Sequence, residues 1–316
     1  MKINSVCVLG GTGFVGHHVC AQLVDAGYRV TVLTRRPDLH RDLLVLPTLK
    51  LVEADVHEQA ELEKHFQGMD AVINLVGILN EKGFDGSGFR HAHVELAKKV
   101  VAACRSRGVR RLLHMSALNA DAANGPSYYL RTKGEAENHV HTFSGGSLAV
   151  TSFRPSVIFG PGDSFINRFA NLMRRIPFVF PLACPDARFA PVYVGDVAEA
   201  FVRALEDRGS FGLRLDLCGP RAYTLRGLLE YTARTLGLRR WIVDLPDWLS
   251  YTQAVVMEHL PGKVFTVDNY NSLKLDSVCT HGAMTCRTAV EAVVPLYLGK
   301  HGRDARYQAY RREAKR

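Results

Sequence analysis

Long hydrophobic runs are missing from this sequence of 316 residues. The longest apolar stretches, such as AVINLVGIL at 71–79, are strand-sized and fall far short of the roughly 20 residues that a spanning helix needs. The first strand pattern begins by Ile3, with no charged-then-apolar leader before it. We therefore expect a soluble protein that neither crosses a membrane nor is exported, with a cytoplasmic location.

Paired cysteine motifs are absent too. The seven cysteines are an odd number and include no C-x-x-C pair, which predicts free thiols in a reducing compartment and no disulfide framework. Cys279, His281 and Cys286 form the one local group of metal-ligating residue types. Their spacing matches no familiar zinc module, so we expect packing and loop roles and no metal.

The sequence also lacks a nucleic-acid-binding module, an internal repeat and a low-complexity segment, and we expect no nucleic acid as a partner. The formal net charge is +9, and residues 300–316 hold seven Lys/Arg against two acidic residues, a net charge of +5. This basic tail either holds an acidic partner or an anionic membrane surface, or is a solvated, frayed terminus.

What the sequence does contain is a regular alternation of six apolar, β-rich runs with four helical periods. The runs lie at 3–9, 28–34, 49–53, 70–76, 110–116 and 147–154, and the helical periods at 14–26, 58–67, 88–107 and 127–142. Near-continuous apolar strands are typical of a parallel sheet covered by helices on both faces. The alternation predicts an α/β fold with a doubly wound parallel sheet.

A smaller second lobe is expected where prolines begin to break the chain, after residue 160. We expect a dinucleotide-binding core over 1–160, joined by a returning strand and helix near 190–207. The interleaved substrate or partner lobe then covers 161–189 and 208–299. Within it, Thr224 is a good N-cap for a helix over 225–236.

The stretch VLGGTGFVGHHV, residues 8–19, places four glycines between a strand and a helix. Glycine allows close backbone approaches, and the following helix presents unpaired N–H groups at its positive end, a combination that suits a pyrophosphate. The strand before and the helix after make a dinucleotide site the favoured interpretation. A merely tight turn is the alternative.

The end of the second strand indicates which dinucleotide is bound. An NAD site places Asp or Glu there, whereas this chain has Thr34 followed by Arg35 and Arg36. Adjacent guanidinium groups can grip a 2′-phosphate, so we predict NADP(H) over NAD(H), unless the two arginines are simply solvated. Asp55, at the end of the third strand, is a candidate for the adenine amino group or for a helix cap.

A candidate for proton transfer lies in SYYLRTKGEAE, where Tyr129 and Lys133 are four residues apart and share one helix face. A lysine ammonium beside the phenol would lower the pKa of Tyr129 and make it a general acid or base. Tyr128 would lie on another face.

Taken together, GGTGFVG, Y-x-x-x-K, RPSVIFGPGD and PVYVGDVAEA resemble the extended short-chain dehydrogenase/reductase superfamily. HMSALNAD, FRPSVIFGPGDSF and GPRAYTLRGLL are most similar to its atypical branch, which contains the nucleotide-binding accessory subunit of respiratory complex I and bacterial relatives. The similarity runs over most of 3–298. It implies a Rossmann fold, an unknown small-molecule substrate or none, and peripheral association with a membrane complex, with the basic tail as a candidate contact.

The resemblance also implies residue roles. Tyr129, Lys133 and Ser116 would be catalytic, although Ala117 occupies the stricter serine position. The cofactor would contact Gly10, Thr12, Gly13, Phe14, Val15, Gly16, Arg35, Arg36, Asp55, Val56, Leu75, Gly77, Ser116, Lys133, Pro155 and Val157.

Two further residues have open roles. His93 stands where many relatives carry an Asn that supports the lysine, and it either substitutes for that Asn or simply packs. Arg188 either grips a substrate phosphate or forms a salt bridge. The function itself has two interpretations: an NADP(H)-dependent reductase, dehydrogenase or epimerase, and a non-catalytic module that holds the nucleotide in a respiratory or quinone-related assembly.

Overall fold

The computed structural model describes residues 2–279 and 284–299. The chain divides into two compact units, the first formed by Met1–Pro155 with Gly195–Asp216 and the second by Ser156–Val194 with Leu217–Arg316. Within the described residues, no helix combines the length and apolar character needed to cross a membrane.

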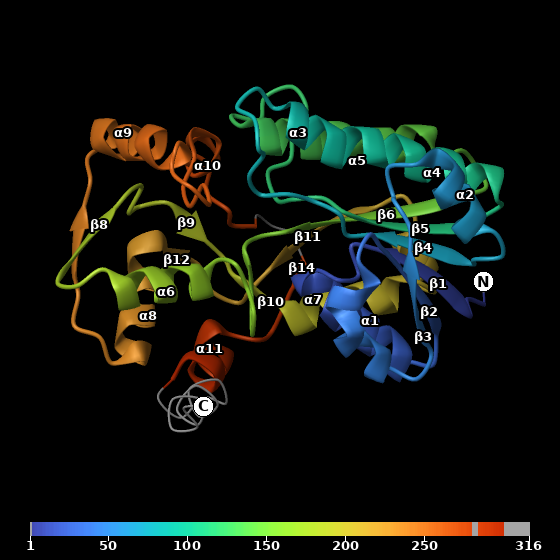
Figure 1. Ribbon diagram of the computed structural model, residues 1–316, viewed down its shortest axis with the longest axis horizontal. Helices are drawn as coiled ribbons and strands as arrows, with labels where there is room; N and C mark the ends of the chain where they lie inside the picture. Colours follow the sequence, from blue (N-terminus) through green and yellow to red (C-terminus); the bar gives the residue numbers. More distant parts are fainter. Residues whose placement is uncertain (1, 280–283, 300–316) are drawn as a thin grey trace. The chain divides into compact units, whose positions relative to one another are not determined.

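The main sheet has eight strands in the order β14-β11-β6-β5-β4-β1-β2-β3, of which β1 to β6 belong to the first unit (Figure 1). The strands are β1 (Ser5–Leu9), β2 (Arg29–Thr34), β3 (Leu49–Glu53), β4 (Ala71–Asn74), β5 (Arg111–Met115), β6 (Ala149–Pro155), β11 (Arg214–Cys218) and β14 (Met284–Thr285). Neighbouring strands from β1 to β6 pair in parallel. The strand order reverses between β1 and β4, the place where doubly wound sheets bind their ligands.

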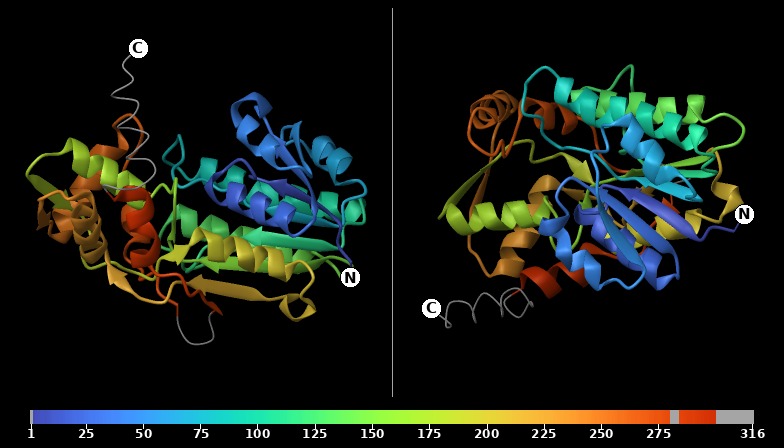
Figure 2. Two further views of the ribbon diagram at one scale, coloured as in Figure 1. Left: turned by 90° about the horizontal axis from the view of Figure 1, so that it is seen from below. Right: turned by 45° about the vertical axis from the view of Figure 1, so that its right-hand side comes forward.

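Helices cover both faces of this sheet, as Figures 1 and 2 show. One face carries α1 (Phe14–Asp25) and α7 (Val194–Ala204), and the other carries α2 (Gln59–Phe66), α4 (Leu96–Ser106) and α5 (Tyr128–Phe143). Fully buried Phe66, Leu96, Leu112 and Val140 belong to the core between the sheet and the second helical layer. The expected doubly wound α/β fold is confirmed.

Two details differ from the expected elements. The helix expected near 88–107 is built from α3 (Ser87–Phe89), a π-helical turn η2 (Arg90–Glu95) and α4. Only the helix of the strand–helix pair expected near 190–207 returns to the first unit. Its strand, β10 (Val192–Tyr193), pairs instead with β7 (Ile158–Phe159) in the second unit, because the Val192 N–H donates to the Val157 carbonyl.

The second unit has its own core, which includes buried residues of three helices. These are α6 (Ile166–Arg175), α8 (Leu225–Leu236) and α11 (Val290–Leu298). The other elements of the second unit are β8 (Val179–Leu182), β9 (Arg188–Phe189), β12 (Tyr223–Thr224), β13 (Trp241–Asp244), α9 (Asp247–Glu258) and α10 (Val267–Ser272). The first unit also contains two 3-10 helices, η1 (Pro37–Val45) and η3 (Arg208–Ser210). Thr224 caps α8 as predicted, because its Oγ1 accepts the Gly227 N–H at 3.0 Å.

A disulfide joins Cys218 and Cys279, so the expectation that all cysteines are free thiols is wrong for this pair. The other five cysteines are not part of a disulfide. The two bonded residues are 61 positions apart, and only the folded chain brings their Cα atoms to 6.0 Å. In the group Cys279, His281 and Cys286, the histidine lies outside the described residues, and the bond uses the Cys279 sulfur.

Candidate functional site

The turn between β1 and α1 is closed by backbone contacts that exclude larger residues. Gly10 has φ +76°, and a Cβ there would lie 3.0 Å from the Leu75 carbonyl carbon. A Cβ on Gly16 would lie 2.3 Å from the Gly10 oxygen. Glycine is therefore required at both positions by the chain's own packing, with the end of β4 directly beside the turn.

The start of α1 fits an anion. The backbone N–H groups of Phe14, Val15 and Gly16 donate to no acceptor among the described residues. Gly13 is the exposed N-cap and offers no side-chain cap, Thr12 before it is half-buried, and the first turn contains no acidic residue. Open donors at the positive end of a helix are what a pyrophosphate requires, so these residues fit that part of a dinucleotide.

Two uncompensated cations follow β2. Thr34 is buried, and its Oγ1 accepts the Arg36 N–H at 3.4 Å. The Arg35 and Arg36 side chains are exposed and have no carboxylate partner within the described residues. Burial, and after it neighbouring cations that include Arg35, lower the pKa of His57. Because His57 lies in the loop after β3, Arg35 is near that loop.

That loop shows what Asp55 does. Its Oδ1 accepts the His57 N–H at 2.9 Å, and the N-cap of α2 is Glu58. The helix-cap alternative for Asp55 is therefore wrong, and the carboxylate instead orders the turn before the helix. Val56 is half-buried against the core.

The loop after β4 approaches α5 closely. Leu75 N–H donates to the Leu9 carbonyl at 3.0 Å, which continues the sheet ladder. A Cβ on Gly77 would lie 2.8 Å from Lys133 Nζ and 3.6 Å from His93 Nε2. Glycine at 77 therefore leaves the space that the lysine ammonium fills.

Lys133 is almost fully buried, at 3% exposed. Its Nζ donates to the Met115 carbonyl, at the end of β5, at 3.1 Å. Burial lowers its pKa from 10.5 to about 8, and the charge of Glu137 opposes that shift. The ammonium is thus held at the carboxyl edge of the sheet, close to the end of β4.

Tyr129 lies one turn before Lys133 on α5, as the spacing predicts. Its half-buried ring makes edge contacts with His93, at 5.6 Å between centroids, and with Phe89, at 6.1 Å. Tyr128 is 41% exposed and stacks with the Arg131 guanidinium. The two tyrosines therefore have different surroundings, and only Tyr129 shares the environment of His93.

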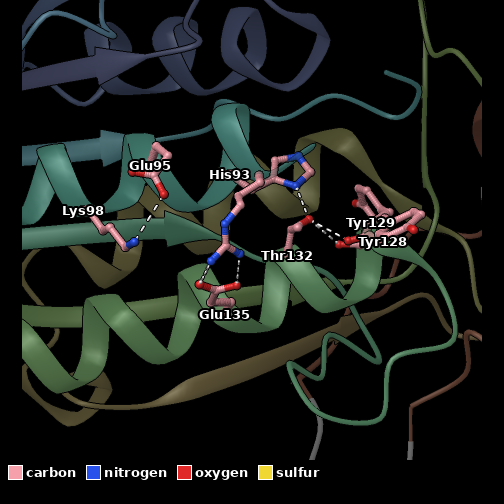
Figure 3. Close-up of polar contacts among 8 residues, drawn as sticks. His93, Glu95, Lys98, Tyr128, Tyr129, Thr132 and Glu135 are labelled. Carbon is pink, nitrogen blue, oxygen red and sulfur yellow. Dashed lines mark hydrogen bonds and ion pairs between the residues drawn. The ribbon is translucent and has the colours of Figure 1, made fainter. Parts of the chain in front are cut away.

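His93 is a fixed, neutral histidine. It is 2% exposed, and its Nε2 accepts the Ile78 N–H at 3.2 Å. Nδ1 therefore carries the hydrogen and donates it to Thr132 Oγ1 at 2.9 Å (Figure 3). Burial, and then the charge of Lys133, lower the pKa of His93 to about 2. These contacts support the packing alternative: His93 ties the loop after β4 to α5.

The hydroxyl of Ser116, the serine expected to orient a substrate, is bound to another buried side chain. Ser116 is 2% exposed, and its hydroxyl donates to Glu137 at 2.9 Å. Ala117 packs in a small cluster with Leu130. The strict serine position thus has no hydroxyl, and the hydroxyl before it is directed into the interior, so the expected role of Ser116 is not supported by this geometry.

Comparison with known proteins identifies the family of the chain. Residues 6–212 match the model of the NAD dependent epimerase/dehydratase family. The chain belongs to this family.

Curated relatives of the chain include both subunits and enzymes. Subunit 9 of the NADH dehydrogenase [ubiquinone] 1 alpha subcomplex from Mus musculus is 32% identical over 232 residues, which cover 71% of this chain and 59% of that protein. The chain thus spans less than two thirds of that relative. Ceramide reductase from Caulobacter vibrioides is 29% identical over 247 residues, 77% of this chain and 74% of the reductase.

Solved structures share the fold. UDP-glucose 4-epimerase from Thermus thermophilus, in complex with NAD, superposes with a TM-score of 0.65 at 21% identity and covers 84% of this chain and 98% of the epimerase. MoeE5 in complex with UDP-glucose and NAD gives 0.65 at 23% identity, over 76% and 85% of the two chains. At these identities the likeness establishes the Rossmann-like fold.

The remaining predicted residues lie at the ends of strands. Pro155 is buried at the end of β6, and its carbonyl accepts the Leu118 N–H at 3.0 Å. Val157 and Arg188 belong to the second unit. The exposed side chain of Arg188 has no carboxylate partner within the described residues, so the salt-bridge alternative is not observed there.

Sequence reasoning missed Glu137, which is fully buried on α5. It accepts from Arg154 Nε at 2.9 Å and lies 3.2 Å from Arg214 Nε, besides binding Ser116. A signal was available: Glu137 follows Lys133 by four residues and Tyr129 by eight, which places all three on one helix face.

One group of metal-ligating side chains within the described residues was also missed. His17 Nε2 lies 2.9 Å from Asp42, and these two residues with His40 bring three ligand atoms within 4.8 Å of one another. His17 Nδ1 is 2.9 Å from the Gly13 carbonyl. All three side chains are partly or largely exposed, and the hydrogen bonds of His17 account for the arrangement.

Proposed function

We propose that the chain binds NADP(H) and transfers hydride between this cofactor and a carbonyl–alcohol pair of a small molecule, with Tyr129 as the proton donor and acceptor. The observation that carries the proposal is the Tyr129–Lys133 pair on α5, whose lysine is buried against the end of β5. The bound cofactor would supply or accept the hydride. The chain's own residues would supply the proton.

The proton chemistry follows from the surroundings of Lys133. With a pKa of about 8, its ammonium is still mostly charged at neutral pH. A positive charge one helical turn from Tyr129 would stabilise the phenolate as the proton is transferred. Tyr129 would then donate its proton to the substrate oxygen during reduction and take it back during oxidation.

The preference for NADP(H) rests on the end of β2. Arg35 and Arg36 are exposed and have no carboxylate partner among the described residues, and Thr34 replaces the acidic residue that would repel a 2′-phosphate. NAD(H) would lose those contacts and bind more weakly. Phe14, Val15 and Gly16 would hold the pyrophosphate of either cofactor.

The enzymes among the relatives favour carbonyl reduction over epimerisation. Besides the Caulobacter ceramide reductase, a (4-alkanoyl-5-oxo-2,5-dihydrofuran-3-yl)methyl phosphate reductase from Streptomyces griseus is 28% identical over 235 residues. Both names describe reductases, and their substrates differ in class. The substrate of this chain is therefore proposed only as a carbonyl compound.

A second candidate function is non-catalytic holding of the nucleotide within a membrane-associated complex. It is favoured by Ser116, whose hydroxyl is bound to Glu137, and by Ala117, which has none. Relatives from Mus musculus and Arabidopsis thaliana are complex I subunits. Under this candidate the protein would lie at the inner face of a membrane, with residues 300–316, which lie outside the described residues, as a contact.

One experiment separates the candidates. Purified protein is incubated with NADPH and a metabolite extract, and consumption of NADPH is followed by its absorbance. We expect Tyr129→Phe to slow consumption by at least about 100-fold with unchanged NADPH affinity. Tyr128→Phe is the matched control and should retain full activity. Tight NADPH binding without any consumption by the unaltered protein would instead support the second candidate.

A further inference from the structure

Two stretches of the second unit repeat one pattern that the proposed function does not use. RRIPFV at 174–179 and RRWIV at 239–243 each place an arginine pair just before an aromatic residue and the start of a strand. The strands are β8 and β13, which pair in parallel. We refer to these two stretches together as the basic–aromatic ribbon.

The register brings the two stretches side by side. Trp241 pairs with Val179, Val243 pairs with Pro181, and the Trp241 N–H donates to the Phe178 carbonyl at 2.8 Å. Because side chains alternate along a strand, one face of the pair carries Val179, Pro181, Trp241 and Val243, and all four are exposed. The other face of β8 is buried in the core of the unit.

Large apolar side chains project from this face and its edge. Phe178 is 80% exposed and Trp241 is 79% exposed. Phe178 also has φ +63°, a left-handed conformation that is an outlier for a bulky residue. The backbone of Phe178 is therefore strained although its ring contributes almost no buried surface. Strain of this kind is typical of functional positions.

Two arginine pairs precede the strands of the ribbon in the sequence. Arg174, Arg175, Arg239 and Arg240 have no carboxylate partner within the described residues. Two of them donate to neutral groups: Arg174 donates to Asn171 Oδ1 at 3.1 Å, and Arg240 Nε donates to the Met173 carbonyl at 3.0 Å. The ribbon therefore has exposed aromatic rings, and the arginines that adjoin it in the sequence have no carboxylate partner in the part of the chain that the structure describes.

We propose that the basic–aromatic ribbon binds the surface of an anionic phospholipid bilayer. Tryptophan and phenylalanine place their rings at the level of the headgroups, and arginine stems lie along apolar surface while their charged ends reach phosphates. Arginines that lack a carboxylate partner among the described residues match a surface of many anions, and each one that reaches the surface adds roughly fivefold to such binding. The ribbon rests on the bilayer as a peripheral contact, and the proposal is independent of whether Tyr129 is catalytic.

The chain contains an internal control for this proposal. It has two tryptophans, and the second, Trp248 on α9, is 67% exposed. Asp247 directly precedes Trp248, and no arginine pair adjoins it in the sequence. Trp248 therefore offers similar exposure without an adjoining arginine pair.

Single-tryptophan variants of the full chain test which residue meets the lipid. Trp248→Phe retains Trp241, and Trp241→Phe retains Trp248. Each variant is mixed with vesicles of phosphatidylcholine and phosphatidylglycerol whose acyl chains carry bromine, a quencher of nearby indole fluorescence. We expect strong quenching of Trp241 and little quenching of Trp248. Quenching of Trp248 alone, or of neither residue, overturns the proposal.

Vesicle sedimentation measures how strongly each variant binds the bilayer. Arg174→Gln combined with Arg175→Gln should weaken binding roughly twentyfold, and Trp241→Ser roughly tenfold. NADPH binding by each variant should be unchanged, which shows that the fold persists. Binding should weaken as salt is added and should fall on pure phosphatidylcholine.

The basic tail is the competing source of vesicle binding. A chain ending at residue 299 retains the ribbon and is compared with the ribbon variants. We expect the shortened chain to bind vesicles in a manner that still depends on Trp241 and Arg174. If the shortened chain loses all binding while the ribbon variants bind like the unaltered protein, the ribbon is not the lipid contact.

Discussion

The Ser116 hydroxyl donates to the Glu137 carboxylate at 2.9 Å, and both side chains are buried. The same carboxylate accepts from Arg154, on β6, and faces Arg214, on β11. Glu137 therefore joins α5 to the ends of three strands. Since α5 also carries Tyr129 and Lys133, this ion-pair group fixes the helix that positions the candidate proton donor.

Glu137→Gln should destabilise the protein by about 2 kcal/mol, because two partly exposed arginines would lose the buried carboxylate that compensates their charge. The matched control is Glu135→Gln on the same helix. Glu135 forms a bidentate pair with Arg90, but both side chains are solvent-exposed, so its loss should cost less than about 1 kcal/mol. Urea unfolding of both variants gives the comparison, and equal losses would contradict the structural role of Glu137.

Gly16→Ala tests the closure of the dinucleotide turn. The added Cβ would lie 2.3 Å from the Gly10 oxygen, so the turn must open, and we expect a loss of about 2 kcal/mol together with weaker NADPH binding. Gly146→Ala is the control, because its Cβ would meet nothing within 4 Å and its φ is not in the left-handed region. That control should be neutral or stabilising by about 0.5 kcal/mol. Thermal unfolding and calorimetric titration distinguish the two variants.

Arg35→Ala tests the preference between the two cofactors. We expect NADPH binding to weaken by about tenfold or more and NADH binding to stay unchanged, because only NADPH carries the 2′-phosphate. Arg41→Ala is a control in the next helical segment, where Arg41 already pairs with exposed Asp38. Calorimetric titration with each nucleotide gives the affinities. An equal loss for both nucleotides would assign Arg35 to the fold or to the pyrophosphate.

The sequence predicted the sheet and the glycine turn well, because both depend on short-range patterns. Apolar runs and a helical period fix β1, α1 and β2 to within a few residues, and the glycine spacing requires no distant contact. The four-residue interval likewise placed Tyr129 and Lys133 on one helix face. Local periodicity is sufficient for such features.

Features that depend on tertiary contacts were not predictable in the same way. The Cys218–Cys279 bond joins residues 61 positions apart, and the orientation of the Ser116 hydroxyl depends on a buried partner 21 residues later. The assignment of β10 to the second unit depends on its pairing with β7. In each case the outcome depends on a contact between residues that are distant in the sequence, and the local sequence pattern does not indicate that contact.

Lys133 should make the stability of the protein depend on pH in a defined interval. Its pKa is about 8 in the folded protein against 10.5 ordinarily, because burial disfavours the charged form. Between these values the unfolded chain binds more protons than the folded one, so the free energy of unfolding rises with pH there. Below pH 8 both states hold the proton, and the fold bears the full cost of the buried charge.

Lys133→Met removes this dependence while it keeps an apolar stem of similar length. From pH 8 to 10.5, the free energy of unfolding of the unaltered protein should therefore rise relative to that of the variant, by on the order of 3 kcal/mol. Lys98→Met, at an exposed lysine paired with Glu95 on the preceding helical segment, should show no such change (Figure 3). Urea unfolding across this interval measures both differences. Parallel curves for the unaltered protein and Lys133→Met would mean that the ammonium is solvated, and the charge proposed to act on Tyr129 would then be screened by water.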